Sequence, residues 1–399
     1  MRKFLRWAVP VLISMSQFLG AADVRMLGFV RIAGDAFRPT LFNPENFCAD
    51  FLGWTAEPVL DLRQFLSFDF EGLSLHWRAD ITGSAEFADG RGGESDFLVN
   101  QFFFQKELTE NLVLIAGRII QRWGTGYAFN PADIVAPDKD LADPNNTEKR
   151  AVGNDMIMLE YYGLSFSLAA CALTHTEIRN GLRLRNGRLA LRFYKNIGQV
   201  DLSILTLFQN REMPVWAGSF AGVIGERLEI HGEARFQKSE AGVSTVYDHE
   251  ILLGFQITLP GDFFLVSEYI YRSRGLSRKA WNRALDTSVS FTGMLNGPSA
   301  EAAAAGLLQN LNVFSPQVAM RHYLMIYLSS PSFRRLTAQS TCLLNPVDRS
   351  FVLIPALGWW VGKSFTFHVR NYIFLGKGKS EFGEFFQSNR WEFGLWVRL

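Results

Sequence analysis

Hydrophobic and polar residues alternate one by one along many short stretches of this chain. In 73–82, Leu75 and Trp77 belong to one series, and His76 and Arg78 belong to the other. The last nine residues, 391–399, alternate in the same way. A period of two is typical of β-strands, whose successive side chains point to opposite faces. Charged residues on one face and aromatic or aliphatic residues on the other predict strands with lipid outside and water inside.

Turn-forming residues divide the alternating stretches into strands. They predict short turns at 71–72, 109–111, 163, 196–198, 225–226, 260–261, 330–332 and 362–363. Longer connections are predicted at 33–61, 89–95, 123–153, 176–186, 211–216, 239–246, 275–317, 346–349 and 376–387. Short and long connections alternate, so the predicted fold is an all-β, antiparallel up-and-down transmembrane β-barrel of 18 strands. The stretches 97–106 and 217–223 alternate irregularly, and without this pair the count is 16.

Composition supports strands over helices as the membrane-spanning elements. The chain is 48% hydrophobic, yet it contains no apolar run of about 20 residues that would suit a spanning helix. Aromatic residues make up 14% of the chain, which suits the aromatic girdles of a barrel. A large soluble β protein is the alternative. The net charge of +1 gives no reason to expect nucleic acid as a partner.

The first 22 residues are predicted to be a secretory signal peptide. Arg2, Lys3 and Arg6 precede a short apolar stretch, and small residues ending at Ala22 suit cleavage. A buried helix or an uncleaved anchor is the alternative. Residues 23–399 then form a single barrel. The three cysteines, which lie far apart, predict neither a disulfide scaffold nor a metal site; they are Cys48, Cys171 and Cys342.

Charged residues opposite the apolar face are expected to line the lumen. The predicted pore-lining residues are Arg78, Arg118, Arg122, Arg188, Arg192, Glu229, Glu233, Arg235 and Glu268. Most of these charges are expected to pair across neighbouring strands. Two arginine pairs, 118 with 122 and 188 with 192, are predicted to lie on adjacent strands and to form the positive side of a constriction. Such a constriction would favour anions.

The stretch 117–133 resembles the strand-to-loop passage of a broad family of porin-like bacterial outer-membrane barrels. The residues that carry the resemblance follow the pattern Trp-Gly-x-Gly and then Asn-Pro-x-Asp; they are Trp123, Gly124, Gly126, Asn130, Pro131 and Asp133. The resemblance implies the compartment and the architecture, and it implies no particular substrate. In a structural interpretation, Asp133 caps a turn and Trp123 anchors the barrel at the membrane interface. In a functional interpretation, Asp133 or Arg122 holds the loop at the pore mouth.

Two long loops and three histidines are the remaining candidates for further chemistry. An alanine-rich stretch, 299–308, predicts a short helix that either folds into the barrel or lies across its mouth. Acidic residues of the 123–153 loop match no calcium-binding loop in their spacing; they are Asp133, Asp138, Asp140 and Asp143. His76, His231 and His368 lie on distant strands outside any catalytic motif. We therefore expect neither an enzyme nor a cofactor.

These observations predict an outer-membrane porin-like channel for passive diffusion of small hydrophilic solutes, with a weak anion preference. The alternatives are a surface-binding or surface-assembly barrel, for polysaccharide or a host ligand, and a channel for hydrophobic ligands of the fatty-acid type. Expected partners are outer-membrane lipid, small solutes and the barrel-assembly machinery. The last strand resembles the signal that this machinery reads, with Leu399 in place of the usual Phe. Both termini would be periplasmic, and the barrel could be a monomer or a trimer.

Overall fold

The fold is that of a computed structural model of the 399-residue chain. It describes residues 22–37, 40–42, 55–70, 73–88, 94–136, 139, 141, 152–177, 183–209, 213–241, 244–311, 318–362, 364–385 and 387–398. Side chains are described except at 22–30, 37, 55–98, 175–177, 183–186, 239–241, 244–246 and 398. The predicted signal peptide, apart from Ala22, and Cys48 lie outside the described residues.

Eighteen strands follow one another along the chain, which confirms the predicted number. They are β1 (Ala22–Phe37), β2 (Thr55–Phe70), β3 (Leu73–Ala88), β4 (Glu94–Thr109), β5 (Leu112–Ile119), β6 (Asn154–Tyr162), β7 (Phe166–Glu177), β8 (Arg183–Ile197), β9 (Val200–Gln209), β10 (Val215–Ile224), β11 (Leu228–Ala241), β12 (Ser244–Leu259), β13 (Phe263–Arg272), β14 (His322–Ser329), β15 (Leu336–Asn345), β16 (Ser350–Val361), β17 (Phe365–Leu375) and β18 (Gln387–Arg398). The two irregular stretches correspond to β4 and β10.

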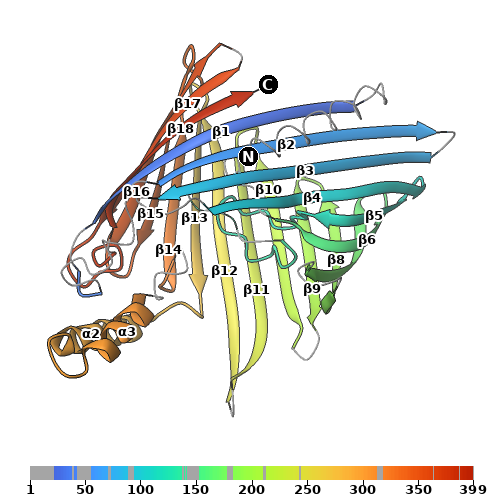
Figure 1. The fold of residues 1–399 in the computed structure, drawn as a ribbon. Coiled ribbons are helices and arrows are strands. Elements are labelled where there is room, and N and C mark those ends of the chain that lie inside the picture. The colour runs from blue at the N-terminus through green and yellow to red at the C-terminus, as the bar shows by residue number, and fades with distance from the viewer. Residues whose placement is uncertain are drawn as a thin grey trace.

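The strands close into one antiparallel barrel (Figure 1). Each strand pairs with its neighbours in the sequence, and β1 also pairs with β18. Closure leaves no unpaired sheet edge, which a lipid bilayer would not tolerate. The predicted turns are found between the strands, and Gly198, Gly225, Gly261 and Gly362 adopt positive φ angles of 65° to 78° in four of them. Glycine favours this backbone conformation because it has no Cβ atom.

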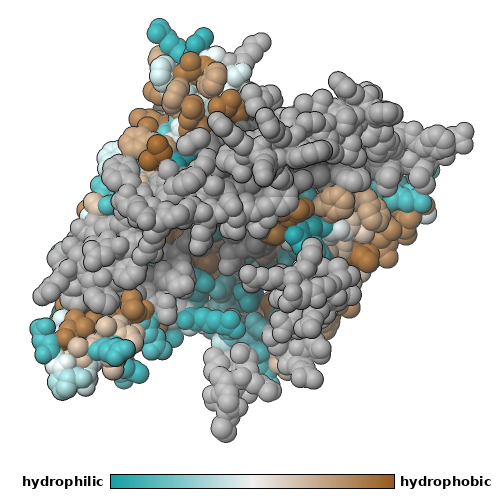
Figure 2. Space-filling model, viewed as in Figure 1, coloured by the Kyte–Doolittle hydropathy of each residue, from teal (hydrophilic) through white to brown (hydrophobic). Residues whose placement is uncertain are grey.

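The two faces of the sheet differ as the alternation predicts. On β6, Ile157 and Leu159 are exposed on the outer face, whereas Met156 and Met158 are buried on the inner face. The same alternation is seen on β8, where Leu191 is exposed and Ala190 is buried. Figure 2 shows hydrophilic residues in the hollow at the centre of the view and hydrophobic residues on the flanks. The outer face is therefore apolar enough to contact lipid.

Two helices connect β13 to β14. They are α2 (Arg278–Met294) and α3 (Ala300–Leu311), of which only α3 was predicted. Trp281 of α2 is fully buried, its ring lies 5.3 Å from that of Phe42, and its Nε1 donates to the Lys379 carbonyl at 2.9 Å. Figure 1 shows both helices outside the barrel, on the side where β13 stops and β14 starts, so α3 does not fold into the barrel. Neither described helix is long and apolar enough to cross a bilayer.

Candidate functional site: a loop that crosses the lumen

The connection after β5 turns inward and reaches the opposite side of the barrel. We call its described residues, 120–136, 139 and 141, the crossing loop. It starts at the end of β5, and its main chain hydrogen-bonds to side chains of β11 and β13. β13 lies eight strands from β5 in a closed ring of 18, which is almost diametrically opposite. The crossing loop therefore spans the lumen.

Glu268 of β13 holds the middle of the crossing loop. Its side chain is fully buried and accepts hydrogen bonds from three consecutive backbone N–H groups, those of Tyr127, Ala128 at 3.0 Å and Phe129 at 3.2 Å. Nε2 of His231, on β11, lies 3.0 Å from Oε1 of the same carboxylate. A buried carboxylate requires such partners, because water no longer solvates it.

Glu233 of β11 binds a second set of main-chain groups. Its carboxylate accepts hydrogen bonds from the N–H groups of Thr125, Gly126 at 2.7 Å and Ala132 at 2.8 Å. A Cβ atom on Gly126 would lie 1.9 Å from the Phe129 carbonyl oxygen, so a side chain at this position would force the loop to shift. Two glutamates on the wall and a glycine in the loop thus determine the path across the lumen.

Asp133 and Lys139 stabilise the loop from within. Asp133 accepts hydrogen bonds from the N–H groups of Trp123 and Gly124, both at 2.6 Å, and pairs with Arg122 at 3.0 Å. The Lys139 ammonium donates to the carbonyls of Gly126 and Tyr127 at 2.8 and 2.9 Å. Burial lowers the pKa of Lys139, although the nearby Asp133 carboxylate acts in the opposite direction. Asp133 therefore shapes the loop in the way both sequence interpretations allowed.

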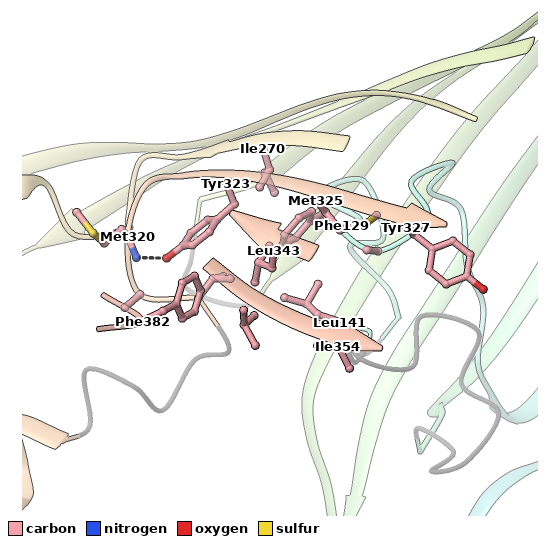
Figure 3. Packing of buried hydrophobic residues seen from close by; sticks show 14 of the residues in the cluster. Phe129, Leu141, Ile270, Met320, Tyr323, Met325, Tyr327, Leu343, Ile354 and Phe382 are labelled. Atoms are coloured by element: carbon pink, nitrogen blue, oxygen red, sulfur yellow. Dashed lines mark hydrogen bonds between the residues drawn. The ribbon is translucent and has the colours of Figure 1, made fainter. Parts of the chain in front are cut away.

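Apolar side chains of the crossing loop cover much of the inner wall. Trp123 belongs to a buried cluster with inward residues of β6 to β10, such as Met158 and Leu205. Phe129 and Leu141 belong to a second cluster, shown in Figure 3, with residues of β12 to β16; these include Ile270, Met325, Tyr327, Leu343 and Ile354. The inward residues of β6 to β10 and of β12 to β16 thus form two apolar clusters with the loop. The strand between them, β11, contributes no residue to either cluster and instead carries Glu233 and His231 on its inner face.

The loop between β17 and β18 covers the wall near the helices. Glu381 of this loop is buried and accepts hydrogen bonds from the Ala319 N–H at 2.8 Å, the Tyr323 hydroxyl at 2.5 Å and the Asn345 amide at 2.8 Å. Tyr323 in turn accepts from the Met320 N–H, the contact dashed in Figure 3. Burial raises the pKa of the Glu381 carboxyl, and these hydrogen bonds lower it by less.

A different chemistry occupies the inner face of β17, β18 and β1. The strand register places Glu392 beside Arg370, and Arg390 beside both Tyr372 and Asp35. Nε of Arg390 lies 2.9 Å from Oε1 of Glu392 and its Nη1 lies 3.7 Å from Oδ1 of Asp35. We call the three strands β17, β18 and β1 the charged arc. Its inner face carries a dense group of charges, and its described side chains contribute no fully buried residue to either apolar cluster, although Tyr372 and Phe374 pack against the second one.

Several predicted pore-lining residues lie on the inner face as expected. Arg192 lies 3.9 Å from Glu160, and Arg188 donates to Asn154 at 3.4 Å. Arg235 donates to Gln237 at 3.2 Å, and Glu229 lies 3.7 Å from Nδ1 of His231. Glu233 and Glu268 bind the crossing loop and are not free charges. The side chain of Arg78 is outside the described residues.

Arg118 was predicted to line the lumen, and this prediction was wrong. In the strand register, Arg118 lies opposite Phe102 of β4 and Asp155 of β6. Phe102 is exposed, and so is Ile157, which lies two residues beyond Asp155 on the same face of β6, so Arg118 lies on the outer face. Its guanidinium pairs with both carboxylate oxygens of Asp155, at 2.8 and 3.0 Å. β5 is apolar on both faces, Leu112 to Ile119 containing a single charge, so alternation could not show which face points inward.

The arginine pairs and Trp123 also lie in positions that differ from the predicted ones. Arg122 follows the end of β5 and belongs to the crossing loop. The strands β5 and β8 are separated by β6 and β7, so the two predicted pairs do not lie on adjacent strands. Trp123 is 3% exposed inside the barrel and does not anchor at the membrane interface. The long-range contacts of the loop, which the local pattern does not encode, explain this difference.

The contact of His231 with Glu268 and the grouping of charges in the charged arc were not predicted from the sequence. The available signal was the strict alternation on β18, where Arg390 and Glu392 interleave with Trp391 and Phe393. Three of the four acidic residues considered for calcium lie outside the described residues; they are Asp138, Asp140 and Asp143. Within the described part of the chain, no three His, Cys, Asp or Glu side chains gather to hold a metal ion.

Comparison with known proteins places this architecture among solved barrels. No protein-family model and no curated sequence matches the chain. Acinetobacter baumannii OccAB1 superimposes with a TM-score of 0.59 and 8% identity, over 96% of this chain and 97% of its own. Pseudomonas aeruginosa OccK5 (OpdH) gives 0.56 and 9%, over 96% and 99%. The Pseudomonas aeruginosa outer membrane protein opdK gives 0.56 and 9%, over 96% and 100%. The chain therefore has the barrel fold of these proteins.

Proposed function

We propose that this protein is an outer-membrane channel through which small hydrophilic solutes diffuse passively, with a weak preference for anions. The observation that carries the proposal is the division of the inner wall. The crossing loop packs on the apolar clusters of β6 to β10 and of β12 to β16, and the charged arc remains as a polar surface on the other side. Charged side chains on a lumen wall hydrate it and select ions by sign.

The outer face supports the membrane location. Exposed aliphatic and aromatic side chains occupy many of the described outer positions, with Ile204 60% and Leu253 56% exposed. Barrels of this kind have short periplasmic turns and longer extracellular loops. β1 begins and β18 ends on the side of the short turns, so we place both termini in the periplasm and the crossing loop at the extracellular entrance. In the same proposal, the barrel-assembly machinery binds the last strand, β18.

The anion preference has a different basis from the one the sequence suggested. Arg192 lies against Glu160, and Arg122 pairs with Asp133 within the crossing loop. The charged arc instead has Arg31, Arg370 and Arg390 around one shared carboxylate. Because the side chains of Arg31 and Arg390 are 21% and 27% exposed and that of Glu392 is 6% exposed, anions are expected to be favoured over cations.

The proposal is tested by single-channel recording of the refolded chain in a planar bilayer. A KCl gradient across the bilayer gives the ion selectivity, and heat-modifiable mobility on electrophoresis serves as the control for folding. We expect steady conductance and a reversal potential on the anion-selective side. A folded barrel that stays electrically silent would contradict the proposal and favour the surface-binding alternative.

The hydrophobic-ligand alternative requires an open apolar pocket in the lumen. The described apolar residues of the inner wall are instead packed against the crossing loop, and Met158, Leu205 and Met325 are fully buried. These side chains already contact protein, which leaves them little surface for a ligand. The geometry therefore supports a polar passage better than an apolar one.

A further inference from the structure

One carboxylate on the charged arc is shared by three arginines. Glu392 Oε1 lies 2.9 Å from Nε of Arg390 and 3.9 Å from Nη1 of Arg31, and its Oε2 lies 3.4 Å from Nη1 of Arg370. The Tyr372 hydroxyl donates to Oε2 at 3.2 Å. These groups come from three neighbouring strands, so the closed sheet itself brings them together.

Two of the three guanidinium groups are more accessible than the carboxylate that joins them, and the third, that of Arg370, is nearly as buried as the carboxylate. The side chain of Glu392 is 6% exposed, whereas those of Arg31 and Arg390 are 21% and 27% exposed. An ion in the lumen therefore approaches the arginines first and meets the carboxylate charge behind them. At separations of about 4 Å, a unit charge in water changes the local population of an ion about fivefold.

We infer that Glu392 determines ion selectivity by limiting the positive potential that this arginine group presents to the lumen. The inference rests on the proposed channel function. Removal of the negative charge of Glu392 makes the local charge more positive by one unit, whatever other partners the arginines have. The passage then becomes more attractive to anions and less attractive to cations.

The barrel offers a matched control on its outer face. Arg118 and Asp155 also form a close arginine and carboxylate pair, on strands of the same sheet, but their register places them outside the lumen. The substitution Asp155→Asn removes the same charge as Glu392→Gln. It tests whether position in the lumen, and not charge loss in itself, alters selectivity.

The experiment compares the wild-type chain with E392Q, D155N and R31Q in planar bilayers under a KCl gradient. We expect E392Q to raise the ratio of anion to cation permeability about two- to fivefold. D155N should leave the ratio unchanged, and R31Q should lower it, because it removes an exposed positive charge. Glutamine at 392 can still accept the hydrogen bond from Tyr372.

The recordings of the wild-type chain and of E392Q test the channel function and the role of Glu392 separately. A conducting wild-type chain whose ratio is unchanged in E392Q would overturn this inference and leave the channel function standing. A silent wild-type chain would overturn the channel function and the inference together. If E392Q does not fold, R31Q decides alone: a lower ratio supports the selectivity role of this group, and an unchanged ratio overturns it.

Discussion

The two parts of the inner wall use buried glutamates in opposite ways. On β11 and β13, Glu233 and Glu268 accept hydrogen bonds from backbone N–H groups of the crossing loop. On β18, Glu392 contacts charged side chains of the wall itself. Main-chain amides hold a segment of the chain in position, whereas guanidinium groups keep a net charge at the surface. In the channel we propose, one side of the barrel thus determines where the passage lies, and the other determines which ions enter it.

Release of the crossing loop should have the largest effect on this division. In the double variant Glu233→Ala, Glu268→Ala, the loop loses six backbone hydrogen bonds to carboxylates. Each such bond to a charged group contributes about 1.5 to 3 kcal/mol. We expect a several-fold rise in single-channel conductance. Glu229→Ala, on the same face of β11, should leave conductance close to the wild-type value.

If the double variant folds and conducts like the wild type, the crossing loop does not limit the passage. The noise of the single-channel current is a second measurement, because a loop that is no longer held should give a noisier current than one that is held. In this comparison E268A alone is expected to have an intermediate effect, since Glu233 still binds the N–H of Ala132.

A smaller change to the loop should follow from Gly126→Ala. The added Cβ would lie 1.9 Å from the Phe129 carbonyl oxygen, so the loop must shift or the contact must strain. We expect a loss of about 1 to 3 kcal/mol in the free energy of unfolding, measured by urea titration in detergent. Gly187→Ala is the control, because its Cβ would meet no heavy atom within 4 Å. Equal stability of the two variants would contradict the path assigned to the loop.

The attachment of the loop between β17 and β18 should depend on pH. Burial raises the pKa of Glu381 above its ordinary value of 4.5. The native state therefore binds the proton of the Glu381 carboxyl group more tightly than the unfolded state does. The stability that the protonated carboxyl contributes is complete below pH 4.5, and it is lost as the pH rises through the raised pKa. Hydrogen exchange of residues 376–385, corrected for intrinsic rates, should show more frequent opening at higher pH.

The same exchange measurement on Glu381→Gln supplies the control. The amide does not titrate, so the corrected opening rate should no longer change with pH. A variant that keeps the wild-type pH dependence would show that another group is responsible, with Asp348 the nearest acidic candidate in contact with the loop.

Deletion of residues 295–310 should have the smallest effect on conductance. Most of α3 would be lost, but both helices lie beyond the strand ends and outside the barrel (Figure 1). We expect the deletion variant to conduct within experimental error of the wild type. A rise comparable to that of the Glu233 and Glu268 double variant would mean that α3 also narrows the passage.

Alternation and turn residues predicted the strand number, the closed antiparallel order and the alternation of short and long connections. These features depend on local sequence, since a glycine or a polar pair ends a strand where it stands. The face of Arg118 could not be predicted, because β5 is apolar on both sides. The path of the crossing loop could not be predicted either. It depends on Glu233 and Glu268, which bind backbone amides more than 100 residues away.

The anchoring of the crossing loop through its main chain has an evolutionary consequence. Every non-proline residue has the same backbone N–H, so Tyr127, Ala128 and Phe129 could be replaced without loss of the hydrogen bonds to Glu268. These hydrogen bonds therefore constrain the backbone and not the identity of the side chain, so the limits on substitution at Ala128 and Phe129 come from packing in the hydrophobic cluster. In the channel we propose, a substitution that packs as well as the original side chain can alter the passage while the course of the loop and the scaffold stay unchanged.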